Sequence, residues 1–406
     1  MRYANYKLTG VRKFPSIPAE WDVRRVKNFA VISHGSDPKT EGDIPVYGSG
    51  DSAFKSCGEF KVGPVVLIGR KGATLHIPHY VEGKYWNVDT AFDVRVVSGN
   101  DLRWFYYLAQ CFDYALYVSQ TTLPSMTQSN YNNMRVPYPP LPTQRAIVAY
   151  LDEKCGKVDR LVAAKENEVA LLKELKQSMI AEAVTGATKV ARTDTARKMK
   201  PSGISWLPEV PEGWEVRRLK SLFSLRHESY SSNEQLMVLS LIKDVGVIPY
   251  DEKGSVGNKS KEDVSGYNVA RKGDIVMNSM NVIIGSVDIT PFDGYISPAY
   301  YALTARDGVD PKFFNYLFHL RSVQKTMRSL AKGILEIRLR ISTTSLLGMA
   351  YPVPPLAEQR EIVAHIEARA AKIDAAVKGL EREVAALKEY KQRLIADVVT
   401  GQRKVA

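Results

Sequence analysis

The sequence predicts an α+β protein. Two globular α/β domains are joined by two long helices that form an antiparallel intramolecular coiled coil with pseudo-two-fold symmetry. An internal repeat is the first observation behind this prediction. Thr9–Phe29 lies over Ser202–Leu222 without a gap, and Pro139–Val190 lies over Pro354–Val405 with 27 of 52 positions identical. The stretches between, 30–135 and 223–350, barely match. Drift after duplication would not preserve the ends while the middles diverged, so we interpret the chain as one scaffold presenting two independent surfaces.

Alternating steps of four and three between apolar residues are the second observation, and they appear after each Pro-rich hinge. Two long helices are predicted from about Gln144 and Glu358, ending before Gly186 and Gly401. Such a seam over more than three heptads indicates a coiled coil, and two near-identical seams in one chain can pair with each other. The predicted seam positions are Val158, Val162, Lys165, Val169, Leu172, Lys176, Met179 and Ala183, and Ile373, Val377, Leu380, Val384, Leu387, Lys391, Leu394 and Val398.

The two variable inserts show a mixture of strand and helix patterns. Each follows a Pro-rich arm whose tryptophan, Trp21 or Trp214, recurs outside the variable region and is therefore expected to pack in a core. Strands are expected at Pro64–Gly69, Phe92–Val97, Asp274–Met277, Val282–Ile289 and Ala299–Thr304. Helices are expected at Leu102–Tyr117 and Pro311–Ala331, with their aromatic residues in the core.

These elements divide the chain into five parts. Residues 1–143 form the arm and first globular domain, 144–186 the first helix, 187–205 a polar and basic linker, 206–357 the second globular domain, and 358–401 the second helix.

Composition favours a polyanionic partner. The net charge of +12 and a pI near 9.3 point to nucleic acid first and an acidic membrane surface second. No apolar run approaches 18 residues and the N-terminus has no signal-peptide core, so we expect no membrane association and a cytoplasmic location. The three cysteines have no metal-ligand spacing, and reduced, buried thiols are expected.

Motifs of catalysis are missing from the sequence. There is no GxxxxGK[ST] loop, no HExxH, no [ND]PP[FYW] and no GxSxG. Asp152 and Glu153 are expected in the first turn of the first long helix, where acidic side chains complement the helix dipole. The sequence predicts a protein that is not itself an enzyme and holds no metal.

The repeated motifs resemble the specificity subunit of a type I restriction-modification system over almost the whole chain. The motifs that carry this resemblance are the arms FPSIPAEW and LPEVPEGW with W(D/E)VRR, the PPL..QR.IV helix starts, the two helix repeats ending in VTG, and RKGDIVMNSMN and GYISPAYYAL in the second insert. The first insert has GPVVLIGRKGA and YWNVDTAF instead, and we interpret it as a different subclass of target-recognition domain.

The resemblance implies a non-catalytic reader of double-stranded DNA with a bipartite, asymmetric target, one half-site per domain. It also implies partners: two methylation subunits, bound through the helices and hinges, and restriction subunits. No cofactor is expected in this chain, and S-adenosylmethionine, ATP and magnesium are expected on the partner subunits. Gln144, Arg145, Gln359 and Arg360 at the helix starts are the expected subunit-binding residues.

Candidate DNA contacts come from polar and basic segments within the inserts. Arg and Lys read guanine and phosphate, Asn and Gln read adenine, and Ser and Thr serve either. The candidates are Arg70, Lys71, Gln120, Thr121, Thr122, Ser125 and Gln128 in the first insert, and Asn278, Asn281, Lys332, Arg338, Arg340 and Thr343 in the second. For Gly69–Gly72 a plain turn remains equally compatible with the sequence. Two alternatives to the whole interpretation stay open: a non-catalytic coiled-coil scaffold protein, and the specificity subunit of a related restriction system.

Overall fold

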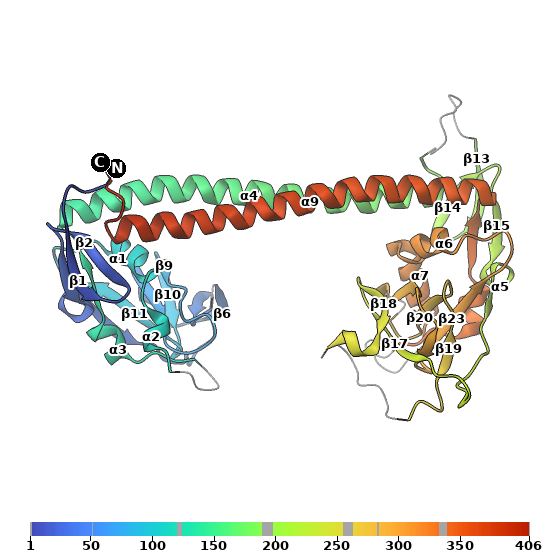
Figure 1. The fold of residues 1–406 in the computed structure, drawn as a ribbon, viewed down its shortest axis with the longest axis horizontal. Helices are drawn as coiled ribbons and strands as arrows, with labels where there is room; N and C mark the ends of the chain where they lie inside the picture. The colour runs from blue at the N-terminus through green and yellow to red at the C-terminus, as the bar shows by residue number, and fades with distance from the viewer. Residues whose placement is uncertain are drawn as a thin grey trace. The chain divides into compact units, whose positions relative to one another are not determined.

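The computed structural model describes residues 2–50, 52–119, 124–188, 198–254, 263–281, 284–332 and 339–405. The chain forms two compact units. Unit 1 comprises Met1–Glu168 and Leu380–Ala406, and unit 2 comprises Val169–Gly379. Helices α4 (Leu141–Thr185) and α9 (Leu356–Val399) each contribute one part to each unit. Each unit therefore has a globular part and a two-helix part (Figure 1).

Both globular parts have the same topology although their sequences differ. Unit 1 contains β1 (Tyr6–Val11), β2 (Phe14–Pro18), β3 (Asp22–Arg25), β4 (Ala30–His34), β5 (Ile44–Tyr47), β6 (Ala53–Cys57), β7 (Lys61–Val62), β8 (Val65–Gly69), β9 (His79–Val81), β10 (Lys84–Asn87), β11 (Ala91–Val96), α1 (Leu102–Ala109), α2 (Tyr114–Tyr117), α3 (Gln128–Asn133) and β12 (Arg135–Tyr138). Unit 2 contains β13 (Met199–Ile204), β14 (Leu207–Pro211), β15 (Glu215–Arg218), α5 (Leu219–Leu222), β16 (Phe223–Leu225), β17 (Met237–Ile242), β18 (Gly246–Pro249), β19 (Asn268–Ala270), β20 (Ile275–Asn278), β21 (Val287–Ile289), β22 (Gly294–Ile296), β23 (Tyr300–Ala305), α6 (Pro311–Phe318), α7 (Arg321–Leu330), α8 (Thr343–Gly348) and β24 (Ala350–Val353).

Strand order shows the correspondence. Unit 1 has sheets β4-β11-β8-β9 and β6-β5-β10-β7, and unit 2 has β16-β23-β20-β21 and β18-β17-β22-β19. The pairs β5/β10 and β17/β22 are parallel at matching places in otherwise antiparallel sheets. Two further two-stranded pairings, β12-β3 and β15-β24, join each arm to its hinge. The two inserts are therefore variants of one fold, which their sequences alone do not reveal.

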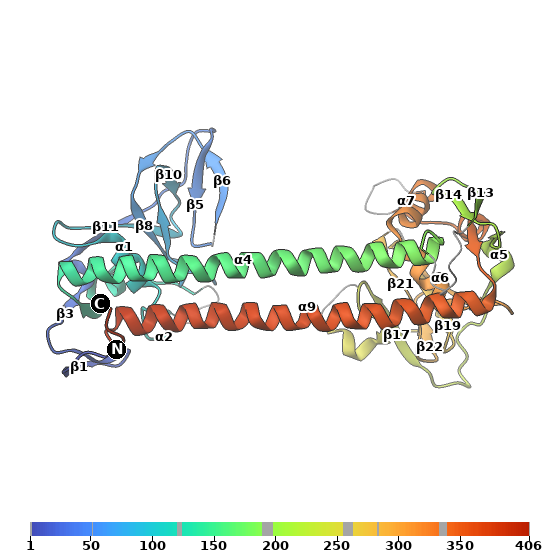
Figure 2. The same cartoon turned by 90° about the horizontal axis from the view of Figure 1, so that it is seen from above.

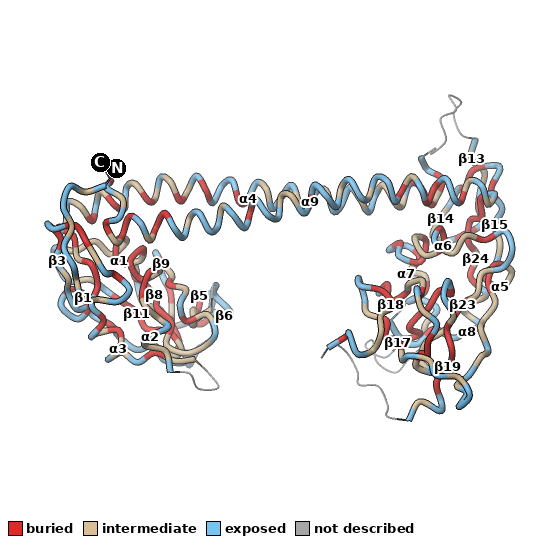
Figure 3. Tube along the Cα trace, in the orientation of Figure 1, coloured by how far each residue is buried: buried red, intermediate tan, exposed pale blue. Residues whose placement is uncertain are grey.

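The main core of each unit extends from the globular part onto the helices, as the buried segments in Figure 3 show. In unit 1 the core reaches the end of α9 at Leu394, Val398 and Val399, and in unit 2 it reaches the end of α4 at Ala183 and Val184. The aromatic residues predicted to be core are buried or half-buried there, and the three cysteines are free and buried.

Each helix ends against the arm of its own unit, which explains the repeated glycine. Gly401 has a φ of +73°, and a Cβ atom there would lie 2.3 Å from Pro18 Cδ. Gly186 has a φ of +77°, and a Cβ atom would lie 2.6 Å from Pro211 Cγ. A left-handed conformation and this close approach both favour glycine. Trp21 and Trp214, at 0% and 1% exposure, complete the two contacts and confirm the predicted packing role.

Helices α4 and α9 pack along the predicted seam and run antiparallel (Figures 1 and 2). In unit 1 Val158 and Val162 of α4 form a small buried cluster with Val384 and Leu387 of α9. Three seam lysines form ion pairs with acids of the opposite helix: Lys391 with Asp159 at 2.7 Å, Lys176 with Asp374 at 2.7 Å, and Lys165 with Glu383. As the position on α4 rises, that of its partner on α9 falls, which confirms the antiparallel intramolecular pairing.

Three expectations about local structure were wrong. The predicted linker 187–205 contains β13, which pairs with β14 as β1 pairs with β2, so the second arm begins at Met199. The expected helix Pro311–Ala331 is interrupted at Leu320, whose backbone is extended and whose side chain is buried in the core, and the helix expected at Leu102–Tyr117 is likewise two helices. Of Val282–Ile289, only Val287–Ile289 is a strand; residues 282 and 283 lie outside the described part.

Candidate nucleic-acid interface

Three loops of unit 1 meet at one end of the β4-β11-β8-β9 sheet. They follow β8, precede β11 and precede α3. Backbone hydrogen bonds hold them together: Arg70 N donates to Thr90 O at 2.7 Å, Met126 N donates to Arg70 O at 2.8 Å, and Gly72 N donates to Pro124 O at 3.0 Å. The loop after β8 is therefore held between the other two, because its residue Arg70 bonds to both.

Unit 2 brings the corresponding three loops together with the same pattern of bonds. Ser279 N donates to Ala299 O at 3.0 Å, and Ile341 N donates to Ser279 O at 3.1 Å. Ser279 thus occupies the place of Arg70, and the loop after β20 lies between the loops that precede β23 and α8. We call each set of three loops the loop face of its unit.

Several predicted DNA contacts lie on the loop face of unit 1. Arg70, Lys71 and Ser125 are brought together, and Lys71 and Ser125 form an isolated β-bridge. Gln128 differs, since its amide nitrogen donates to Ile32 O at 2.6 Å and ties α3 to β4. Gln120, Thr121 and Thr122 lie outside the described residues.

The predicted contacts of unit 2 divide into exposed and buried residues. Asn281 is exposed. Lys332 and Arg340 are also exposed, and their backbones exchange two hydrogen bonds of 3.0 and 2.9 Å. Two cationic residues therefore lie side by side on neighbouring segments of the chain. Asn278 is only 7% exposed, and its Oδ1 accepts from Met280 N at 3.1 Å. Thr343 is half-buried in the first turn of α8, and Arg338 lies outside the described residues.

Asp89 is a loop-face residue that the sequence analysis missed. Arg70 Nη1 donates to the backbone oxygen of Asp89 at 3.0 Å and to its carboxylate at 3.2 Å, and Lys71 Nζ lies 3.7 Å from the same carboxylate. The three side chains are 29 to 48% exposed, so they are accessible while held in place. A carboxylate beside an arginine orients the guanidinium fork, which matters when two parallel hydrogen bonds must reach one guanine. The only available sequence signal was an acidic residue three positions before the predicted strand Phe92–Val97.

Two of the four predicted subunit-binding residues are structural. Gln144 and Gln359 are fully buried. Gln144 Oε1 accepts from Asp101 N at 2.9 Å and its Nε2 donates to Pro139 O at 3.0 Å. Gln359 makes the same bonds to Asp310 N and Pro354 O. The prediction of direct subunit contact is therefore wrong for both glutamines, because their amides fasten the start of each long helix to its globular part. Arg145 and Arg360, next to them, are exposed and remain predictions.

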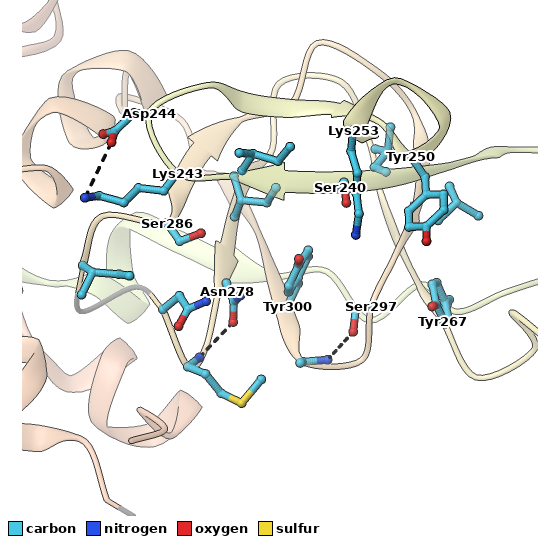
Figure 4. A pocket seen from close by; sticks show the side chains of 18 residues that line it. Ser240, Lys243, Asp244, Tyr250, Lys253, Tyr267, Asn278, Ser286, Ser297 and Tyr300 are labelled. Atoms are coloured by element: carbon cyan, nitrogen blue, oxygen red, sulfur yellow. Dashed lines mark hydrogen bonds and ion pairs between the residues drawn. The ribbon is translucent and has the colours of Figure 1, made fainter. Parts of the chain in front are cut away.

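A cavity of about 540 Å³ opens beside the loop face of unit 2 (Figure 4). Asn281 and Ala299 of the loop face and Asn278 at the end of β20 are among its lining residues. The sheet β18-β17-β22-β19 and the short 3-10 helix Tyr250–Lys253 contribute Ser240, Tyr250 and Lys253. This cavity was not predicted, because its walls come from segments far apart in the sequence.

Metal-binding clusters are absent from the described residues, where no three His, Cys, Asp or Glu side chains are placed to hold a metal ion. No described helix combines the length and apolar character needed to cross a bilayer.

Comparison with known proteins agrees with the repeated architecture. The family model described as "Type I restriction modification DNA specificity domain" matches twice, at residues 18–171 and 211–384. The chain is 23% identical over 301 residues to the type I restriction enzyme MjaVIII specificity subunit of Methanocaldococcus jannaschii, covering 70% of this chain and 66% of that protein. It is 24% identical over 305 residues to the type I restriction enzyme EcoBI specificity subunit of Escherichia coli, covering 70% and 61%. The matched part thus spans just under two thirds of these relatives.

A solved structure shares the fold. It comes from work on the complex assembly and conformational transition of the type I R-M system, and the match has a TM-score of 0.66 at 16% identity, covering 94% of this chain and 98% of that one. The two family matches together cover most of the chain, and each includes the end of one arm, one insert and most of one long helix. The chain therefore belongs to the family of type I restriction-modification DNA specificity proteins.

Proposed function

We propose that this chain reads a bipartite, asymmetric DNA target within a type I restriction-modification complex, with one half-site for each loop face. The observation that carries this proposal is the same three-loop arrangement in two units with different side chains. Arg70, Lys71 and Asp89 occupy the loop face of unit 1, whereas Ser279, Met280 and Asn281 occupy the matching loops of unit 2. A common frame with different side chains predicts two different half-sites.

Charge supports DNA as the ligand. The chain carries a net charge of +12, and Arg70, Lys71, Lys332 and Arg340 place cationic groups on the two loop faces. Phosphate contacts of this kind provide most of the affinity of a DNA-binding protein, while base contacts provide specificity.

Partner subunits supply the chemistry in this proposal. Two methylation subunits dock on the helices and hinges, where Arg145 and Arg360 are exposed, and restriction subunits join that core. S-adenosylmethionine, ATP and magnesium bind to those partners. The chain itself acts in the cytoplasm as a non-catalytic reader, consistent with the catalytic motifs missing from its sequence.

Mapping methylated sites in the host genome would identify the target, and a mobility-shift titration with that duplex would test the reading role. We expect log affinity to fall linearly with log salt, with a slope of about 0.9 per phosphate contacted. Arg70→Gln and Arg340→Gln should each weaken binding, whereas Arg393→Gln, an exposed change on α9, should not. A chain that binds its methylated-site duplex no more tightly than a scrambled one would instead favour a coiled-coil scaffold. Turnover by the purified chain, abolished by a point mutation within it, would contradict the non-catalytic role.

A further inference from the structure

The cavity of unit 2 combines the features of a ligand site with a position at the edge of the loop face. Its volume of about 540 Å³ lies within the range of small-molecule sites and exceeds that of a single nucleobase. Because Asn281 and Ala299 belong both to the loop face and to the lining, and Asn278 ends the strand that leads into this face, a group that enters the cavity comes from the side where DNA is read. The cavity therefore lies next to the loop face, which would read base edges in a groove, and is distinct from it.

Aromatic rings form part of the lining. Tyr300 lies near the centre of the view, and Tyr250 and Tyr267 lie at its right (Figure 4). Burial raises the pKa of the Tyr300 hydroxyl, so this tyrosine stays neutral at physiological pH. Neutral aromatic faces stack on nucleobases of any sequence.

The charged groups of the lining are Lys253 and an ion pair in which Lys243 Nζ lies 3.6 Å from Asp244 Oδ2, and Asn278 is one of its amides. Lys253 is only 9% exposed, its Nζ lies 4.6 Å from the centre of the Tyr250 ring, and its side chain points into the cavity (Figure 4). Asn278 Oδ1 is occupied by Met280 N, which leaves the amide nitrogen of this nearly buried side chain as the group that can donate to a ligand. One ammonium group suits a phosphate, and an amide donor suits a base acceptor.

We propose that this cavity binds one nucleotide, with the base against the tyrosines and the phosphate at Lys253. The inference rests on the proposed DNA-reading role and deepens it, because the nucleotide is one that leaves the stacked target duplex next to the loop face. Extrusion of a base costs a few kcal/mol, and stacking on aromatic side chains offsets that cost. A free mononucleotide has the same chemistry and is the other source to be distinguished.

Two arms of one experiment test the proposal with the full chain. In the first, each deoxynucleoside monophosphate is titrated calorimetrically. In the second, 2-aminopurine is placed in turn opposite each position of the unit 2 half-site, where it gains fluorescence if its pairing partner leaves the helix. We expect a signal at one position in the duplex arm, and Lys253→Gln should reduce it at least about fivefold. Tyr250→Leu, a second variant that leaves the buried lysine in place, should reduce it similarly.

Lys272→Gln is the matched control, because it removes the same charge from an exposed lysine of unit 2 that does not line the cavity. Lys253-dependent binding of a free mononucleotide without extrusion would keep the nucleotide site and change its source. If the duplex binds but neither arm gives a signal that depends on Lys253, the cavity proposal is wrong. If neither the duplex nor any mononucleotide binds, both the DNA-reading role and the cavity proposal fail. If a mononucleotide binds and the duplex does not, the DNA-reading role fails and the nucleotide site is kept.

Discussion

At the residue scale, each unit buries the indole N–H of a repeated tryptophan, but the residues around that N–H differ between the units. Trp214 Nε1 donates to Glu358 Oε2 at 3.0 Å, whereas Trp21 Nε1 makes no hydrogen bond of normal geometry to any described residue. Thr143 occupies the place of Glu358 in the first copy. The Tyr3 hydroxyl is the group with which the Trp21 side chain interacts, outside normal hydrogen-bond geometry. A buried N–H whose acceptor is poorly placed is costly, so unit 1 carries a penalty that unit 2 avoids.

Exchange of these two residues should change stability in opposite directions. Glu358→Thr removes the acceptor of Trp214 and should lower the free energy of unfolding by about 1–2 kcal/mol. Thr143→Glu offers Trp21 an acceptor and should raise it. Chemical denaturation followed by tryptophan fluorescence measures both. Equal destabilisation by the two variants would show that the indole bond does not account for the difference.

Asp89 is predicted to control discrimination at the unit 1 half-site. Asp89→Asn removes the charge that holds Arg70 and Lys71, which frees both to contact phosphate. We expect discrimination between the correct base and its substitutes to fall by about 1–3 kcal/mol at one position, with non-specific affinity unchanged or higher. Competition binding with single-base variants of the target is the measurement.

Asp43→Asn is its control, since Asp43 is exposed and lies directly before β5, outside the three loops of the loop face. A loss of discrimination in the unit 2 half-site, or an equal loss from Asp43→Asn, would argue against local control by Asp89.

At the element scale, periodicity predicted more than composition did. The seam was predictable because Val158, Val162 and Val384 recur at steps that only a paired helix explains, and the structure buries them. The interruption at Leu320 could not be predicted from the sequence. The helix breaks there because the Leu320 side chain packs in the core, and no local sequence pattern encodes that tertiary contact.

The loop faces show the same contrast between what local sequence patterns predict and what tertiary contacts decide. Their segments were predicted from polar composition, but the cavity and the role of Asp89 depend on contacts between distant loops. The buried role of Gln144 was missed for the same reason: its repeated position fitted a surface contact as well as a structural bond.

The seam ion pairs are predicted to set the register of the two helices. Lys391→Glu places two carboxylates opposite each other at Asp159 and should lower the melting temperature, whereas adding Asp159→Lys should restore most of the loss. The coupling should be about 0.2–1 kcal/mol, because both groups are partly exposed, and should shrink in high salt. Thermal unfolding of the double-mutant cycle measures it. Zero coupling between positions 391 and 159 at low salt would show that the buried seam valines, and not the ion pairs, set the register.

At the scale of the whole molecule, two inserts of one topology on a repeated frame predict modular specificity. Replacing the segment between Phe29 and Pro137 with the corresponding insert of a related protein should change one half-site and leave the other intact, because each loop face closes within its own unit. Methylation mapping of the chimaera is the measurement. Changes in both halves would show that the units do not read independently.

The two long helices are predicted to set the spacing between the half-sites. The seam from Val158 to Ala183 corresponds to about 39 Å of helix, close to the 34–36 Å between half-sites one turn of DNA apart. The target should therefore contain several unread base pairs. A heptad must be removed from both helices at once, because knobs on one need holes on the other.

The paired deletion of Val162–Glu168 and Val377–Glu383 meets this requirement. It removes Lys165 together with its partner Glu383 and keeps the Asp159–Lys391 and Lys176–Asp374 pairs on either side. The helices shorten by about 10 Å, or about three base pairs, so binding should move to targets with shorter gaps. If the accompanying turn of about 100° around the duplex prevents simultaneous contact, binding should instead be lost. Deletion of Val162–Glu168 alone is the control and should destabilise the seam. Undiminished binding of the original target by the double deletion would show that the helices do not measure the gap.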